Sequence, residues 1–168
     1  MAEQTEARKD ELVVTRIIDA PVEIVWQAWT EPEHVMHWWG PKDYTSPSAK
    51  IDLRVGGKYV FAMQAPQEQG GQVSYTAGVY QRIVPKQLLE FTQGLSDAHG
   101  NPIDPAQIGM PADFPKELHT VVTFRARGDM TELTITQSGW VPSQMFVYAL
   151  AGTQQQTDKL SAYVQRKR

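Results

Sequence analysis

The chain has 168 residues, no cysteine, and a formal net charge of −3 from 16 basic and 19 acidic side chains. This length favours one domain that buries a substantial core without metals or disulfides. The lack of cysteine excludes disulfides, thiolate metal sites and cysteine nucleophiles. The mild acidic balance gives no attraction toward a phosphate backbone, so we expect no nucleic-acid partner.

The N-terminal ten residues are polar and charged, and they lack the apolar segment of a secretory signal. We expect residues 1–10 to be disordered and residues 11–168 to form the single domain. No apolar run approaches the roughly 20 residues that a membrane-spanning helix needs, so we expect no membrane insertion and a cytoplasmic location.

The first elements are a strand followed by two helices. Residues 12–18 are apolar and β-branched, which predicts a strand. Pro21 suits the first turn of a helix, and the apolar residues that follow recur at helical spacing through residue 29. Thr30 as a cap, with Pro32 in the first turn, predicts a second, short helix that runs through Trp38 and is ended by Gly40-Pro41.

The period then changes to two, which indicates strands. Tyr59, Phe61 and Met63 should share one face, and Lys58 and Gln64 the other. Further strands are predicted at residues 73–84, 88–92, 118–125 and 132–137, separated by short turns. Short strands joined by short turns indicate an antiparallel meander.

Residues 97–115 form a long stretch rich in proline and glycine without a clear period. Loops of this length in a compact domain are often lids or binding loops, although a packed surface loop explains the stretch equally well. Ile103, Ile108, Met110 and Phe114 could cap an apolar opening near Trp38 or Trp39.

The C-terminal part returns to helical spacing, with a stripe formed by Phe146, Leu150, Thr153, Leu160 and Val164. Ser143 suits the N-cap of one helix over residues 143–164. One sheet face needs an apolar cover, and this helix is the only long element that can supply it. The sequence therefore predicts an α+β fold in which an antiparallel sheet packs on a long C-terminal helix.

Several motifs together resemble the SRPBCC (START-like, birch-pollen-allergen-like) superfamily, and within it the C-terminal domain of the activator of heat shock protein ATPase homologue. They are Asp19-Ala20-Pro21, the run from Val25 to His34, Trp38-Trp39-Gly40-Pro41, the run from Asp52 to Tyr59, Leu89-Glu90-Phe91-Thr92, Val122-Thr123-Phe124, Thr131-Glu132-Leu133-Thr134 and the run from Asp158 to Tyr163. The resemblance covers about residues 12–165. It implies a helix-grip fold, in which a curved antiparallel β-sheet wraps around the long C-terminal α-helix, with two short helices after the first strand.

The resemblance also implies an apolar cavity between the sheet and the last helix, and a small hydrophobic molecule as the partner. Gly152-Thr153 stands where relatives often carry Gly-Trp, and Arg82 lies near a position that is often acidic in relatives. A relative's ligand should therefore not be transferred to this chain. The eukaryotic chaperone activator has a further N-terminal domain for its partner, which these 168 residues have no room for.

The aromatic side chains and their neighbours are the candidate ligand-binding residues, because small-molecule sites have mostly apolar walls with a few polar groups. The candidates are Trp38, Trp39, Tyr59, Phe61, Met63, Tyr80, Arg82, Phe91, Phe124, Phe146, Leu150 and Thr153. Gln93 and Gln156 are further polar candidates. Ordinary core packing is the competing explanation for each aromatic residue.

No catalytic residue, cofactor or metal is predicted, since the chain contains no nucleophile elbow, P-loop, dinucleotide fingerprint or zinc-protease motif. His34 and His37 could form a weak metal site with Glu31 or Glu33, but a solvated helix face explains them too. Three functions remain open: binding of a small hydrophobic ligand, a cyclase- or hydrolase-like enzyme in the same cavity, and a chaperone-associated interaction module. The oligomer is expected to be a monomer or a homodimer.

Overall fold

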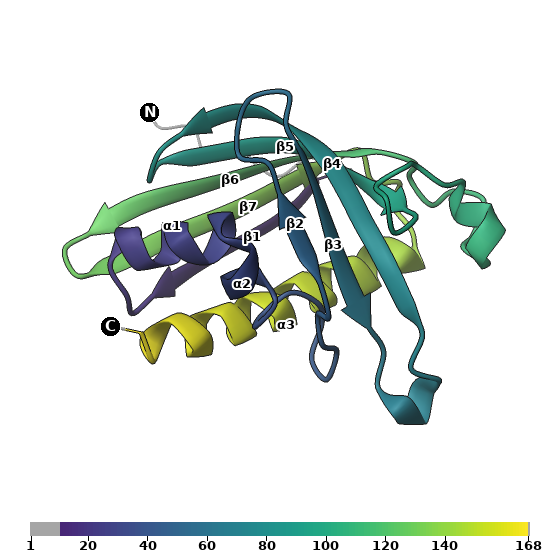
Figure 1. The fold of residues 1–168 in the computed structure, drawn as a ribbon, viewed down its shortest axis with the longest axis horizontal. Coiled ribbons are helices and arrows are strands. Elements are labelled where there is room, and N and C mark those ends of the chain that lie inside the picture. The colour runs from purple at the N-terminus through teal and green to yellow at the C-terminus, as the bar shows by residue number, and fades with distance from the viewer. Residues whose placement is uncertain (1–10, 168) are drawn as a thin grey trace.

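The computed structural model describes residues 11–167. Seven strands, three α-helices and two short 3₁₀ turns follow one another along this part of the chain (Figure 1). Their order is β1 (Glu11–Ile18), α1 (Val22–Thr30), α2 (Pro32–Val35), β2 (Ala49–Ile51), β3 (Lys58–Gln64), η1 (Gln67–Gln69), β4 (Val73–Val84), β5 (Leu88–Ser96), η2 (Pro105–Ile108), β6 (Leu118–Arg127), β7 (Met130–Ser138) and α3 (Gln144–Gln165).

The seven strands form one sheet in the order β1-β7-β6-β5-β4-β3-β2, and every neighbouring pair is antiparallel. Burial alternates along β6 and β7, as expected for strands with one face on the core. The sheet curves, and α3 runs across its open side (Figure 1). This is the predicted α+β helix-grip arrangement.

The long helix α3 is held differently in its two halves. Toward its C-terminal end, Thr157, Leu160, Tyr163 and Val164 are buried against the core. Toward its N-terminal end, none of the residues is fully buried. The N-terminal half therefore covers the sheet without packing tightly into it.

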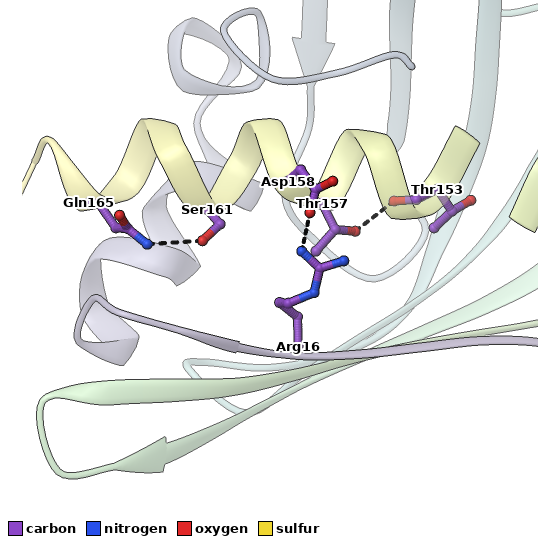
Figure 2. A network of polar contacts seen from close by, with 6 residues as sticks. All are labelled: Arg16, Thr153, Thr157, Asp158, Ser161 and Gln165. Atoms are coloured by element: carbon purple, nitrogen blue, oxygen red, sulfur yellow. Dashed lines mark hydrogen bonds and ion pairs between the residues drawn. The ribbon is translucent and has the colours of Figure 1, made fainter. Parts of the chain in front are cut away.

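Polar contacts fix the start and the middle of α3. The Ser143 hydroxyl accepts the backbone N–H of Phe146 at 3.2 Å, which confirms Ser143 as the N-cap. Arg16 reaches from β1 to the carboxylate of Asp158 (Figure 2). The Asp158 side chain is 65% exposed, so this ion pair between α3 and the edge strand β1 adds little stability.

The core consists of two apolar clusters. The larger cluster packs α1 and the C-terminal half of α3 against the middle of the sheet, and includes Val25, Trp38, Tyr59 and Leu160. The smaller cluster surrounds Trp140 and joins Leu12 and Leu118 to the first turns of α3. The two clusters occupy different stretches of the same sheet face.

Most predicted elements are confirmed, with small differences at their ends. The second helix ends at Val35, and the Thr30 hydroxyl donates to Trp26 O at 2.8 Å, so Thr30 does not cap it. β2 was not predicted, because three residues are too few to show a period. The predicted disorder of residues 1–10 lies outside the described residues. No helix within residues 11–167 is long and apolar enough to cross a membrane.

Candidate functional site

A cavity of about 380 Å³ lies between the sheet and the N-terminal half of α3. Its walls include Trp29 of α1, the segment after α2, six of the seven sheet strands, the end of the long loop and α3. The wall residues are Leu12, Trp29, Trp39, Pro41, Tyr44, Met63, Thr76, Phe91, Gln93, Gly94, Leu95, Met110, Phe114, Pro115, Leu118, Thr120, Ile135, Gln137, Trp140, Met145, Tyr148, Ala149, Gly152, Thr153 and Gln156. Tyr148 is 61% exposed, so the cavity opens to solvent beside it.

The position of the cavity follows from how α3 is docked. Leu160 and Val164 are inaccessible to solvent, which holds the C-terminal half of the helix close to the sheet. The wall residues of the other half include Ala149, Gly152 and Thr153, which are small and leave the space beside them unfilled. The cavity therefore forms where the two core clusters meet, with walls from both.

A hydrogen-bond network crosses the sheet side of the cavity. Trp140 Nε1 donates to Gln137 Oε1 at 2.8 Å. Gln137 Nε2 donates to Gln93 Oε1 at 3.1 Å and to Thr120 Oγ1 at 3.0 Å. Because these polar groups bond to one another, they can line an otherwise apolar wall without a large desolvation cost.

The cavity wall carries no charge. Among the wall residues from the described part of the chain, none is Asp, Glu, His, Lys or Arg, and Tyr44 and Tyr148 are the ones that can ionise. Lys159 lies behind the wall segment of Trp39 and Tyr44, where its ammonium group donates to backbone oxygens. Such a wall can receive an uncharged molecule more readily than an ion.

Comparison with known proteins identifies the family. The model of the family "Activator of Hsp90 ATPase homolog 1-like protein" matches residues 19–165. The chain belongs to this family. The match spans all three helices and the sheet apart from β1, which agrees with the SRPBCC-type resemblance of the motifs. No curated protein matches the sequence significantly.

Solved structures of similar proteins share the fold of this family member. A protein from Nitrosomonas europaea has a TM-score of 0.74 at 20% identity, with 96% of this chain and 98% of the other covered. A protein from Arthrobacter aurescens has a TM-score of 0.75 at 23% identity, with 97% of this chain and 90% of the other covered. An AHSA1-like protein from Aeromonas hydrophila has a TM-score of 0.70 at 20% identity, with 94% of this chain and 93% of the other covered. Likenesses at these identities show the fold alone.

Four of the twelve candidate ligand-binding residues of this family member lie in the cavity wall, namely Trp39, Met63, Phe91 and Thr153. The polar candidates Gln93 and Gln156 lie there as well. The other aromatic candidates pack elsewhere: Trp38, Tyr59, Phe61, Tyr80 and Phe124 belong to the larger core cluster, and Phe146 and Leu150 flank the smaller one. Trp38 is 1% exposed and donates to Ala28 O at 3.0 Å, so its role there is structural.

Arg82 is the candidate that the structure places farthest from its predicted environment. The register shifts between Tyr80 and Arg82, so that Tyr80 pairs with Phe91 whereas Arg82 pairs with Glu90. Adjacent strand residues point to opposite faces, so this β-bulge turns Arg82 to the face of Glu90. Arg82 is exposed and is not a wall residue, contrary to the expectation that it lies near the cavity.

Sequence reasoning did not identify the polar network, although the sequence carries a signal for it. The inward positions of β7 read Leu133, Ile135 and then Gln137, and those of β5 read Leu89, Phe91 and then Gln93. Each strand thus changes from apolar to polar on its buried face, and both changes occur near the same end of the sheet. Polar residues at buried strand positions are uncommon and mark a site or a network.

The two histidines of the α2 region contact the end of α3. His34 Nδ1 lies 2.5 Å from Tyr163 Oη, and His34 Nε2 lies 3.3 Å from Glu31 Oε1. The His37 ring stacks on Tyr163 with centroids 4.7 Å apart. Within residues 11–167, no three acidic, histidine or cysteine side chains are arranged to hold a metal ion.

Proposed function

We propose that this protein binds a small, largely apolar molecule in the cavity between the sheet and the N-terminal half of α3. The observation that carries the proposal is a cavity of about 380 Å³ whose wall is mainly aliphatic and aromatic with a few polar groups. Its volume lies in the range of small-molecule sites, about 300–1,000 Å³, and its composition is typical of them. Affinity at the micromolar level, about −8 kcal/mol, would suit a ligand of this size.

An enzyme using the same cavity is the first alternative. General acid–base catalysis relies mostly on histidine, carboxylate or lysine side chains within hydrogen-bond reach of the reacting group. Tyr44 and Tyr148 are the ionisable side chains that the described residues contribute to the wall. This composition supports binding in preference to acid–base catalysis.

A chaperone-associated role is the second alternative, because the family takes its name from an activator of the Hsp90 ATPase. That role would use the outer surface of the domain, and filling the cavity should leave it intact. Ligand binding depends on the cavity itself, so a substitution that only fills the cavity separates the two functions.

The test compares two tryptophan substitutions on the same helix. Thr153→Trp places an indole in the cavity, whereas Gln154→Trp places it on the exposed side of α3. The neutral dye N-phenyl-1-naphthylamine should bind the wild type and Gln154→Trp, and Thr153→Trp should bind at least tenfold more weakly. Native mass spectrometry of the chain purified from its own host should also show a retained ligand. Equal dye binding by both variants would contradict binding in this cavity.

A further inference from the structure

The cavity network fixes the orientation of the Gln93 side-chain amide. An indole nitrogen can only donate, so the contact from Trp140 Nε1 identifies the oxygen of Gln137. Gln137 Nε2 must then donate, and it lies 3.1 Å from Gln93 Oε1. The reverse orientation of Gln93 would set two NH₂ groups against each other. Gln93 therefore has its oxygen engaged, and its Nε2 has no acceptor among residues 11–167.

Gln156 presents the same arrangement from α3. The backbone N–H of Gly40 donates to Gln156 Oε1 at 2.7 Å. Since a backbone nitrogen can only donate, this contact fixes the orientation of the second amide. Gln156 Nε2 likewise has no acceptor among the described residues. Two amides, from the sheet and from the helix, thus keep their oxygens occupied and their N–H groups free.

These free N–H groups can be reached from the cavity. The one side-chain nitrogen or oxygen that is both sealed from solvent and unpartnered in residues 11–167 is Trp29 Nε1. The nitrogens of Gln93 and Gln156 therefore touch accessible space, and both residues belong to the cavity wall. Each amide nitrogen carries two N–H donors, so the cavity offers hydrogen bonds to an acceptor.

The charge of the wall limits which acceptor fits. A carboxylate entering the cavity would lose its water without meeting a cation, which is costly. Lys159 gives its N–H groups to the backbone oxygens of Gly40, Pro41 and Tyr44 at 2.9 to 3.2 Å, so it is not free to pair with a ligand. A neutral carbonyl oxygen avoids this cost and accepts from an amide.

We propose that the cavity selects neutral apolar molecules bearing a carbonyl-type oxygen, such as ketones, esters, amides or quinones, and that this oxygen accepts a hydrogen bond from Gln93 Nε2, with Gln156 Nε2 as a second donor. The inference rests on the proposed function and adds the chemical class of the ligand. Gln93 is the stronger donor site because Gln137 and Thr120 hold its oxygen in place.

Three probes of similar size test the class: hexanophenone with a neutral carbonyl, hexylbenzene with no acceptor, and 4-pentylbenzoate, which is ionised at pH 8. Calorimetric titrations are performed on the full chain and on Gln93→Met, Gln156→Met and Gln155→Met. Methionine keeps the length of the side chain without its N–H groups. Gln155 is the matched control, because its Oε1 also accepts a backbone N–H, from Lys42 at 3.2 Å, but the residue is exposed and outside the wall.

The measured quantity is the dissociation constant of hexylbenzene divided by that of hexanophenone, which cancels effects that a variant has on both probes. Gln93→Met should lower this ratio about three- to tenfold, Gln156→Met should lower it in the same direction, and Gln155→Met should leave it unchanged. 4-Pentylbenzoate should bind the wild type more weakly than hexanophenone. Circular dichroism melting verifies that each variant is folded. If Gln93→Met does not fold, Gln156→Met alone provides the test of the amide donors.

Two kinds of failure are distinguishable. If hexylbenzene binds but the ratio is the same in the wild type and in both cavity variants, the donor role of the amides is wrong while the cavity still binds ligands. Tighter binding of 4-pentylbenzoate than of hexanophenone would overturn the preference for neutral molecules. If none of the three probes binds, the proposed function fails together with this inference.

Discussion

Lys159 Nζ on α3 lies 2.9 Å from Tyr44 O, within the segment that links α2 to β2. The same ammonium group also donates to the backbone oxygens of Gly40 at 3.0 Å, Pro41 at 3.2 Å and Trp39 at 3.4 Å. One cation thus binds the middle of α3 to the chain segment that supplies Trp39, Pro41 and Tyr44 to the cavity wall. Burial lowers the pKa of Lys159, and the nearby Asp43 carboxylate acts in the opposite direction.

Replacing Lys159 by methionine should therefore destabilise the domain and loosen this wall. Four backbone oxygens would lose a charged donor, so we expect the free energy of unfolding to fall by about 1–3 kcal/mol in urea denaturation. Lys42→Met is the control, because Lys42 is an exposed lysine in the segment between α2 and β2 that Lys159 contacts. The loss of Lys42 should change the free energy of unfolding by no more than about 0.5 kcal/mol. Equal stabilities for the two variants would show that the Lys159 contacts contribute nothing.

Gly152 is a wall residue on α3, and its replacement should have a measurable effect on the stability of that helix. A Cβ added there would lie 3.6 Å from Pro41 Cγ, an ordinary contact, so close packing does not require glycine. Gly152→Ala should raise the free energy of unfolding by about 0.5–1 kcal/mol, because alanine costs less backbone entropy in a helix. Gly78→Ala is the contrasting variant: its Cβ would lie 1.7 Å from Thr92 O, and it should strongly destabilise the sheet. A loss of stability in Gly152→Ala would indicate that α3 needs glycine at this position.

The buried phenol of Tyr59 predicts a dependence of stability on alkaline pH. Burial raises the pKa of Tyr59 well above its usual value, and the neighbouring Tyr80 raises it further. The folded state keeps this proton while the unfolded state loses it above about pH 10. The stabilising contribution is therefore complete below pH 10 and declines as pH rises, by about 1.4 kcal/mol per pH unit for one phenol.

Urea denaturation between pH 9 and pH 11 measures this dependence. Tyr59→Phe should lower stability at pH 8 by about 1 kcal/mol, since the hydroxyl donates to Thr92 O at 2.7 Å, and should reduce the alkaline slope. A slope identical to that of the wild type would contradict the assignment to Tyr59.

The sequence was sufficient to predict the fold, because the two-residue period of Tyr59, Phe61 and Met63 and the apolar stripe of α3 each place a face on the core. It was less informative about the cavity. Tyr59 and Phe91 point to the same side of the sheet and their rings pack against each other. Of these two residues, however, only Phe91 lines the cavity. Which part of that face remains uncovered depends on how deeply α1 and α3 dock, and residue periodicity does not report depth.

The β-bulge beside Tyr80 illustrates a second limit. A regular strand would place Arg82 on the same side as Tyr80, and only the shifted register turns it outward. No glycine or proline marks the bulge in the sequence. Thr153 lies in the wall, whereas Phe146 and Leu150 of the same helical stripe pack on the smaller core cluster, so the stripe alone does not separate wall residues from core residues.

The loop between β5 and β6 divides into two parts with different surroundings. Residues 97–109 are tied to one another: the Asp97 carboxylate accepts the backbone N–H groups of His99 and Asn101, and Asp104 accepts that of Ala106. Ile108 in this part is 47% exposed. Met110, Phe114 and Pro115 in the following part belong to the cavity wall.

We therefore predict that residues 110–114 act as the cover of the cavity and that residues 97–109 do not. The Phe114 ring packs edge-on against Trp140 with centroids 5.7 Å apart, so the cover closes on an aromatic wall residue that a ligand would also touch. Hydrogen exchange should show increased protection of the amides of Met110 and of residues 112–114 when hexylbenzene saturates the cavity, because a filled cavity adds apolar contacts that oppose opening. Residues 103–108 and the turn at residues 85–87 should not respond, which makes them internal controls. Unchanged exchange at residues 110–114 with bound hexylbenzene would mean that this segment is a fixed part of the wall. A response confined to residues 103–108 would contradict the prediction, because the cover would then lie in the first part of the loop.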